Sequence, residues 1–158
     1  MVMGWDSIMS IGLLAALATL LFAAGLEDIR HREIAQWKNV AIALLAPAWW
    51  WASGLSPWPD MAFQVAIASA VFGLFAAAFH LGLMGGGDVK MIGALALWFP
   101  FPHFAQLLIV MSLVGGAITL AMMIERRWKG REVEVPYGVA IAIAGLFALR
   151  EPILNQFT

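Results

Sequence analysis

The chain has 158 residues, of which 63% are hydrophobic and 12% are charged, whereas soluble globular domains average about 45–50% apolar and about 25% charged residues. This composition excludes a soluble enzyme and a disordered tail, and the net charge of −1 lacks the basic surface of a nucleic-acid-binding protein. The absence of cysteine excludes a disulfide framework, a thiol nucleophile and a zinc–thiolate site. We therefore expect an integral membrane protein with one polytopic domain over residues 1–158.

Long stretches without lysine or arginine mark the predicted membrane spans, since a helix needs about 20 apolar residues to cross the hydrocarbon core. The first, third and fifth of these stretches are long enough, while the second, fourth and sixth are short. We predict an all-α fold with about six transmembrane helices, and four spans with re-entrant segments are the alternative. The predicted spans are residues 8–26, 40–52, 61–83, 89–101, 104–124 and 139–149.

The basic residues predict the orientation of these helices. Every lysine and arginine except Arg150 falls on one of three alternate connections, which are 27–39, 84–90 and 125–138. Because positive residues stay on the cytoplasmic side, we expect these connections inside and both termini outside.

Two aspartates lie at this predicted inner face. Asp28 follows the first span by two residues, and Asp88 immediately precedes the fourth. Ionisable residues at such positions are costly and are candidates for function. The alternative is that each is an interfacial carboxylate paired with a nearby base, Arg30 or Arg32 for Asp28 and Lys90 for Asp88.

The stretch Gly85-Gly86-Gly87 before Asp88 favours a functional site. Each glycine costs a helix about 1 kcal/mol relative to alanine, so this segment predicts a break between helices. At membrane depth a break is tolerated where it is buried in protein or lines a watery cavity. Two neighbouring carboxylates cannot both ionise easily. The ionised one can take a proton from water while the protonated one polarises a peptide carbonyl, and this chemistry needs no metal or cofactor.

Three motifs resemble the type IV prepilin peptidases, a family of membrane aspartic proteases. Gly85-Gly86-Gly87-Asp88-Val89-Lys90 resembles the Gly-x-Gly-Asp motif with the Val-Lys extension typical of that family. Residues 27–34 resemble the segment around its first aspartate, and residues 135–141 resemble the start of its last helix. One departure is Ala35-Gln36, where the family usually has Pro-Asn.

The resemblance implies an endopeptidase that removes the basic leader of type IV pilin or pseudopilin precursors at the cytoplasmic face of the bacterial inner membrane. Its partners would be precursors with a basic leader and an apolar helix, the lipid bilayer and the pilus assembly machinery, and not nucleic acid. The size resembles the short form found in tight-adherence (Flp) pilus systems, which has no methyltransferase domain. The implied catalytic residues are Asp28 and Asp88, with Gly85, Gly86, Gly87 and Lys90 in the active-site loop and Arg30, Ile34, Pro136, Tyr137 and Gly138 as substrate-binding candidates.

Other functions remain open on the sequence alone. Broken helices and acidic groups also occur in transporters and channels, and a non-catalytic subunit of a pilus machine or a presenilin-like intramembrane protease would share the fold class. Several loop acids are either solvated or attract a basic leader: Glu27, Glu33, Glu125, Glu132 and Glu134.

Overall fold

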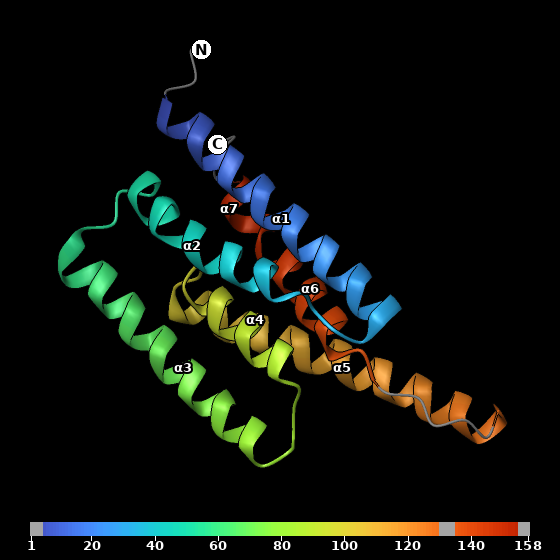
Figure 1. The fold of residues 1–158 in the computed structure, drawn as a ribbon. Helices are drawn as coiled ribbons and strands as arrows, with labels where there is room; N and C mark the ends of the chain where they lie inside the picture. Colours follow the sequence, from blue (N-terminus) through green and yellow to red (C-terminus); the bar gives the residue numbers. More distant parts are fainter. Residues whose placement is uncertain (1–4, 130–134, 155–158) are drawn as a thin grey trace.

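The helices of the computed structural model, which describes residues 5–129 and 135–154, follow the predicted apolar stretches (Figure 1). The described residues contain no strand, so the predicted all-helical class is confirmed. The elements in chain order are α1 (Trp5–His31), α2 (Gln36–Ala52), a short helical turn η1 (Pro57–Met61), α3 (Ala62–His80), α4 (Gly86–Ala96), α5 (Phe101–Lys129), α6 (Tyr137–Ala148) and α7 (Arg150–Leu154).

Three segments are long and apolar enough to cross a membrane: Ser7–His31, Pro57–His80 and Phe101–Glu125. They correspond to the first, third and fifth predicted spans. Helices α4 and α6 have 11 and 12 residues and are shorter than a full crossing requires, while the 17 residues of α2 are at the lower limit. The count of six spans and the outward termini therefore stay predictions. The short helix α7 is an element that the hydropathy pattern did not indicate.

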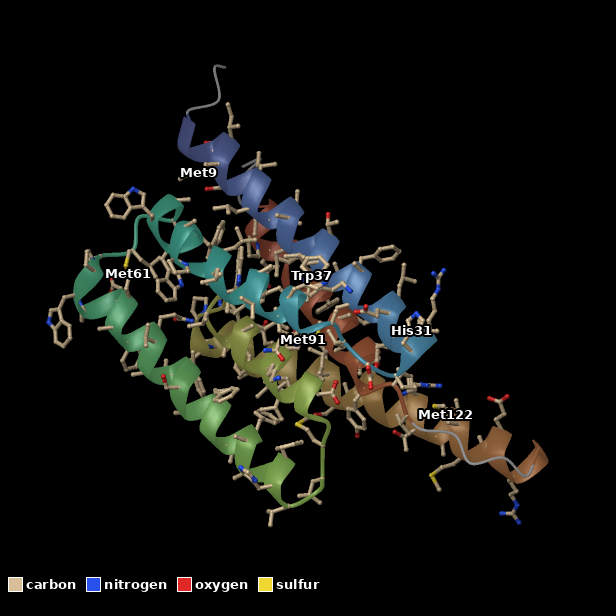
Figure 2. The ribbon with its side chains drawn as sticks, viewed as in Figure 1. Met9, His31, Trp37, Met61, Met91 and Met122 are labelled. Atoms are coloured by element: carbon tan, nitrogen blue, oxygen red, sulfur yellow. The ribbon has the colours of Figure 1, made fainter. Side chains whose placement is uncertain are left out.

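Helix α4 lies at the centre of the structure. It contacts α2, α3, α5 and α6, and α6 in turn packs between α1 and α5. Met91, Ile92 and Leu95 of α4 are fully buried, and Figure 2 shows Met91 among the surrounding helices. Gly145 of α6 allows close packing, because a methyl group there would lie 2.9 Å from Leu21. The helix that carries Asp88 is therefore enclosed by the rest of the fold.

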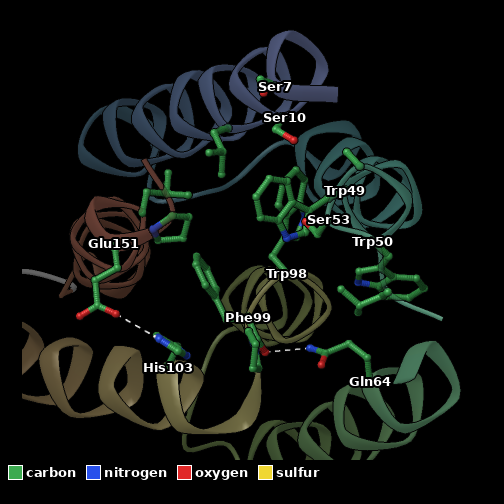
Figure 3. Close-up of a pocket in the computed structure, with 16 residues that line it drawn as sticks. Ser7, Ser10, Trp49, Trp50, Ser53, Gln64, Trp98, Phe99, His103 and Glu151 are labelled. Atoms are coloured by element: carbon green, nitrogen blue, oxygen red, sulfur yellow. Dashed lines mark hydrogen bonds and ion pairs between the residues drawn. The ribbon is translucent and has the colours of Figure 1, made fainter. Parts of the chain in front are cut away.

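The C-terminal end of α4 is fixed by side chains from its neighbours. Gln64 of α3 donates hydrogen bonds of 2.7 Å to the carbonyls of Ala96 and Phe99. Trp50 of α2 donates to the carbonyl of Leu97 at 2.7 Å, and these bonds satisfy carbonyls that a helix end leaves free. Figure 3 shows this end of the molecule, where Gln64 reaches Phe99 beside a cavity of about 470 Å³. The anchored end of α4 is opposite the end that carries Asp88.

Candidate active site

A cavity of about 690 Å³ brings Asp28 and Asp88 together from separate helices. Asp28 comes from the last turn of α1, and Asp88 from the first turn of α4. The glycine segment 85–87 and Tyr137 line the same cavity. The cavity therefore lies where the C-terminus of α1 meets the N-termini of α4 and α6.

Asp28 is held against the start of α6. Its side chain is 5% exposed, and its Oδ2 accepts a hydrogen bond of 3.1 Å from the backbone N–H of Val139. The first N–H groups of a helix have no partner within the helix and carry a partial positive charge, so they stabilise a carboxylate at this position. Gly138 makes the approach possible, because a methyl group on it would lie 2.9 Å from Oδ2 of Asp28.

Asp88 is half-buried and lies outside the three segments that are long enough to span a membrane. Burial and the nearby carboxylate of Asp28 raise the pKa of Asp88 to about 6, although a backbone hydrogen bond from Gly85 opposes this shift. A methyl group on Gly85 would lie 3.1 Å from Oδ2 of Asp88, so the glycine segment packs directly against the carboxylate. The two aspartates thus interact electrostatically, and Asp88 retains its proton to a higher pH than an exposed aspartate does.

Ile34 lies between the two glycine positions that border the aspartates. A methyl group on Gly138 would approach Cδ1 of Ile34 to 2.7 Å, and one on Gly87 would approach its Cβ at 3.7 Å. The turn between α1 and α2 thus fills the space between the start of α4 and the start of α6. Ile34, Gly87 and Gly138, all predicted site residues, are brought together here.

Glu27 fixes this turn. Its Oε2 accepts a hydrogen bond of 2.8 Å from the backbone N–H of Ala35 and pairs with Lys38, whose side chain is 8% exposed. These two contacts give Glu27 a part in holding the turn, which neither the solvated nor the leader-binding interpretation included. Ala35 supplies an N–H that a proline would lack, so the departure from Pro-Asn provides the hydrogen bond to Glu27.

Lys90 and Arg30 do not line the aspartate cavity. Lys90 is exposed and donates to Oε1 of Gln36 at 3.1 Å. Arg30 is exposed on α1. Lys90, expected in the active-site loop, lies within helix α4, as do Gly86 and Gly87 at its start, and its side chain is directed to α2. Tyr137 lines the cavity, and Pro136 is buried beside it.

Arg32 is a site residue that the sequence analysis considered only as a base paired with Asp28. It lines the cavity, and its Nη1 is buried without a hydrogen-bond partner among the described residues. It has a φ of 57° just after α1, a conformation that usually favours glycine. The spacing was the available signal, because residues four apart in a helix are neighbours, although the structure places Arg32 just beyond the end of α1.

No three histidine, cysteine, aspartate or glutamate side chains within 5–129 and 135–154 form a group that could hold a metal ion. Glu33 is exposed at the edge of the cavity. Glu132 and Glu134, which were expected either to be solvated or to attract a basic leader, lie outside the described residues.

Two carboxylates from separate helices thus share one cavity of a helical protein with three segments long and apolar enough to cross a membrane. The sequence profile of the type IV leader peptidase family matches residues 4–120, and the chain belongs to this family. The matched residues include both aspartates, while the segment 135–141 lies beyond them. The resemblance stated from the motifs is thereby confirmed.

One relative is the prepilin leader peptidase/N-methyltransferase of Legionella pneumophila, which is 30% identical to this chain over 66 residues. The matched region is 42% of this chain and 23% of that protein, so the chain spans less than a quarter of this relative's length. No solved structure matches the chain.

Proposed function

We propose that this protein is an aspartic endopeptidase that removes the leader peptide of type IV prepilins or pseudopilins, of the Flp type, at the cytoplasmic face of the bacterial inner membrane. The observation that carries this proposal is the meeting of Asp28 and Asp88 in one cavity of a chain that belongs to the type IV leader peptidase family. The proposal assigns peptide hydrolysis, and no methyl transfer, to residues 1–158.

The proposed mechanism uses one proton shared by the two aspartates. The N–H of Val139 holds the carboxylate of Asp28 in place, and Asp88 has a pKa raised to about 6. Asp28 then takes a proton from the attacking water, and protonated Asp88 donates a hydrogen bond to the carbonyl oxygen of the scissile peptide. The water oxygen bonds to the carbonyl carbon to give a tetrahedral intermediate. Asp28 then passes the proton it took from water to the peptide nitrogen as the C–N bond breaks, which releases the leader with a new carboxyl terminus and a new N-terminal amine.

The pH dependence of cleavage tests the protonated role of Asp88. Because burial and Asp28 raise the pKa of Asp88 to about 6, the group carries its proton below that pH and loses it above. We expect kcat/KM, which reports the free enzyme, to fall as the pH rises through about 6. Initial rates on a purified precursor in detergent, between about pH 5 and pH 8, measure this. A kcat/KM that rises across the same interval would instead make Asp88 the general base.

The charge of Arg32 is expected to stabilise the developing oxyanion. Arg32→Met should lower kcat by about 10²- to 10³-fold, the usual effect of removing a donor to an oxyanion, with a smaller change in KM. Arg30→Met removes the same charge from an exposed position that does not line the cavity, and should lose far less activity. Steady-state kinetics of both variants make the comparison. An equal loss of kcat in the two variants would contradict a role of Arg32 at the cavity.

The direct test of the proposed function is co-expression of this protein with Flp-type and other pilin-like precursors, read as a shift in gel mobility and as the sequence of the new N-terminus. Cleavage at the leader junction is expected. A properly inserted protein that leaves every tested precursor intact would overturn the proposal.

A further inference from the structure

A second cavity lies between α2 and α3, with α4 as its floor. Both helices pack on α4 but make no extensive contact with each other, and Figure 1 shows α3 diverging from α2 on either side of α4. The space between them is about 390 Å³. We refer to it as the α2–α3 groove, and it is lined by Val40 and Ala43 of α2, Ala68 and Phe72 of α3, and Gly93 and Leu97 of α4.

The lining of the α2–α3 groove suits a transmembrane helix. Its surface is mainly apolar, and the small residues Ala68 and Ala94 are buried in it, while the ring of Phe72 lies against Gly93. Without a hydrophobic driving force in lipid, helices associate where small side chains allow their backbones to approach closely. Val40 and Phe72 at the walls are exposed, so they are free to contact a helix placed between α2 and α3.

One end of the groove is polar and holds an unsatisfied acceptor. Asn39 is 4% exposed, and its Nδ2 donates to the carbonyl of Gly87 at 3.4 Å. Its Oδ1 is buried and has no hydrogen-bond partner in the described part of the chain. Leaving such an acceptor unpaired is costly, and an acyl chain has no donor to offer. The first N–H groups of a helix, in contrast, are free donors.

The polar end of the groove adjoins the aspartate cavity. Gln36 and Lys90 line the groove, while Ile34 and Asp88, two residues away in each segment, line the cavity. The link between Asn39 and Gly87 separates the two spaces. If a bound helix has its N-terminus beside Asn39, the extended residues that precede this helix lie next to Asp88.

We propose that the α2–α3 groove binds the apolar helix of the precursor, and that Oδ1 of Asn39 accepts a backbone N–H from the first turn of this helix. The leader then passes over Gly87 into the aspartate cavity, where the bond before the helix is cleaved. This inference rests on the proposed function, and it names the surface that selects a substrate with an apolar helix directly after its leader.

Photo-cross-linking tests this placement. A benzoylphenylalanine is introduced in place of Val65 or Phe72, exposed residues that line the groove. Matched controls replace Ile109 or Leu113 of α5, which are 60% and 69% exposed and do not line it. The experiment uses a Flp-type precursor and protein that also carries Asp88→Asn, so that the bound precursor is not cleaved. We expect at least tenfold more cross-linked precursor from the groove positions than from the control positions. Equal or greater yields from α5 would overturn the inference.

Protein that carries Asp88→Asn also allows the role of Asn39 in precursor binding to be tested without interference from cleavage. Asn39→Leu should raise the precursor concentration that gives half-maximal cross-linking by about tenfold, the effect of losing one well-made hydrogen bond. An unchanged concentration would remove Asn39 from the binding model. Failure of the active protein to cleave any precursor would overturn the proposed function and this inference together, whereas cleavage without cross-links from the groove would overturn this inference alone.

Discussion

Replacement of either Asp28 or Asp88 by asparagine is expected to lower the rate of precursor cleavage by about 10²- to 10⁴-fold, the usual contribution of a general acid or base. Asparagine keeps the size of each side chain but can neither take a proton from water nor release one. Both aspartates line the same cavity, so each single variant removes one half of the proton transfer. Cleavage of a co-expressed precursor, compared on one gel for wild type and both variants, measures the effect.

Asp60→Asn is the matched control for this experiment. Asp60 is exposed and precedes α3 at the end of that helix away from the cavity, where its Oδ2 accepts a hydrogen bond from Ser56. The control variant should cleave at the wild-type rate. An amide at position 28 or 88 changes the charge of the side chain and not its shape, so all three variants should insert into the membrane. Fractionation of the cells checks this. Wild-type cleavage by either Asp28→Asn or Asp88→Asn would refute the assignment of that residue.

Gly138→Ala is expected to lower the cleavage rate by about 10²-fold without any change of a charged group. A methyl group on Gly138 would lie 2.9 Å from Oδ2 of Asp28 and 2.7 Å from Cδ1 of Ile34, so the carboxylate has to move. A displacement of about 1 Å in a catalytic group is enough for a loss of this size. The expected loss is in kcat, measured with purified protein and precursor.

Gly116→Ala is the corresponding control, since a methyl group there meets nothing within 4 Å. In the middle of a helix this change should be neutral or slightly stabilising. Both variants are compared for thermal unfolding in detergent as well as for activity. If Gly138→Ala cleaves the precursor as fast as Gly116→Ala does, Asp28 does not need its position against α6.

The apolar stretches were sufficient to predict six helices but not how deeply each one crosses the membrane. Helix α4 has only 11 residues, yet it is apolar nearly throughout because other helices enclose it. Apolarity from enclosure and apolarity from lipid contact give the same hydropathy signal. The short helix α7 was missed because Arg150 and Glu151 interrupt the apolar pattern.

The aspartates of the candidate site were predicted from motifs, whereas their supporting contacts were not. Glu27 and Lys38 lie eleven residues apart across a turn, and no local periodicity joins two residues at that distance. Asn39 could not be distinguished from any other polar residue near a helix start, because its place at the site depends on its hydrogen bond to Gly87 in a distant segment. Such contacts follow from tertiary packing, which a single sequence does not display.

The fixed C-terminal end of α4 determines how the α2–α3 groove can change its width. Trp50 ties α2 to Leu97, and Gln64 ties α3 to Ala96, so both walls are attached to α4 at the same end. At the other end the groove is bordered by the 3.4 Å contact between Asn39 and Gly87. At that end α2 is also tied to α4 by the hydrogen bond from Lys90 to Gln36, whereas the hydrogen bonds of α3 through Gln64 lie at the fixed end. Helix α3 is therefore the wall that can separate most beside the aspartates. If the precursor helix binds in the groove as proposed, we expect bulkier residues at its start to be accommodated by tilting of α3 and not by repacking of the core.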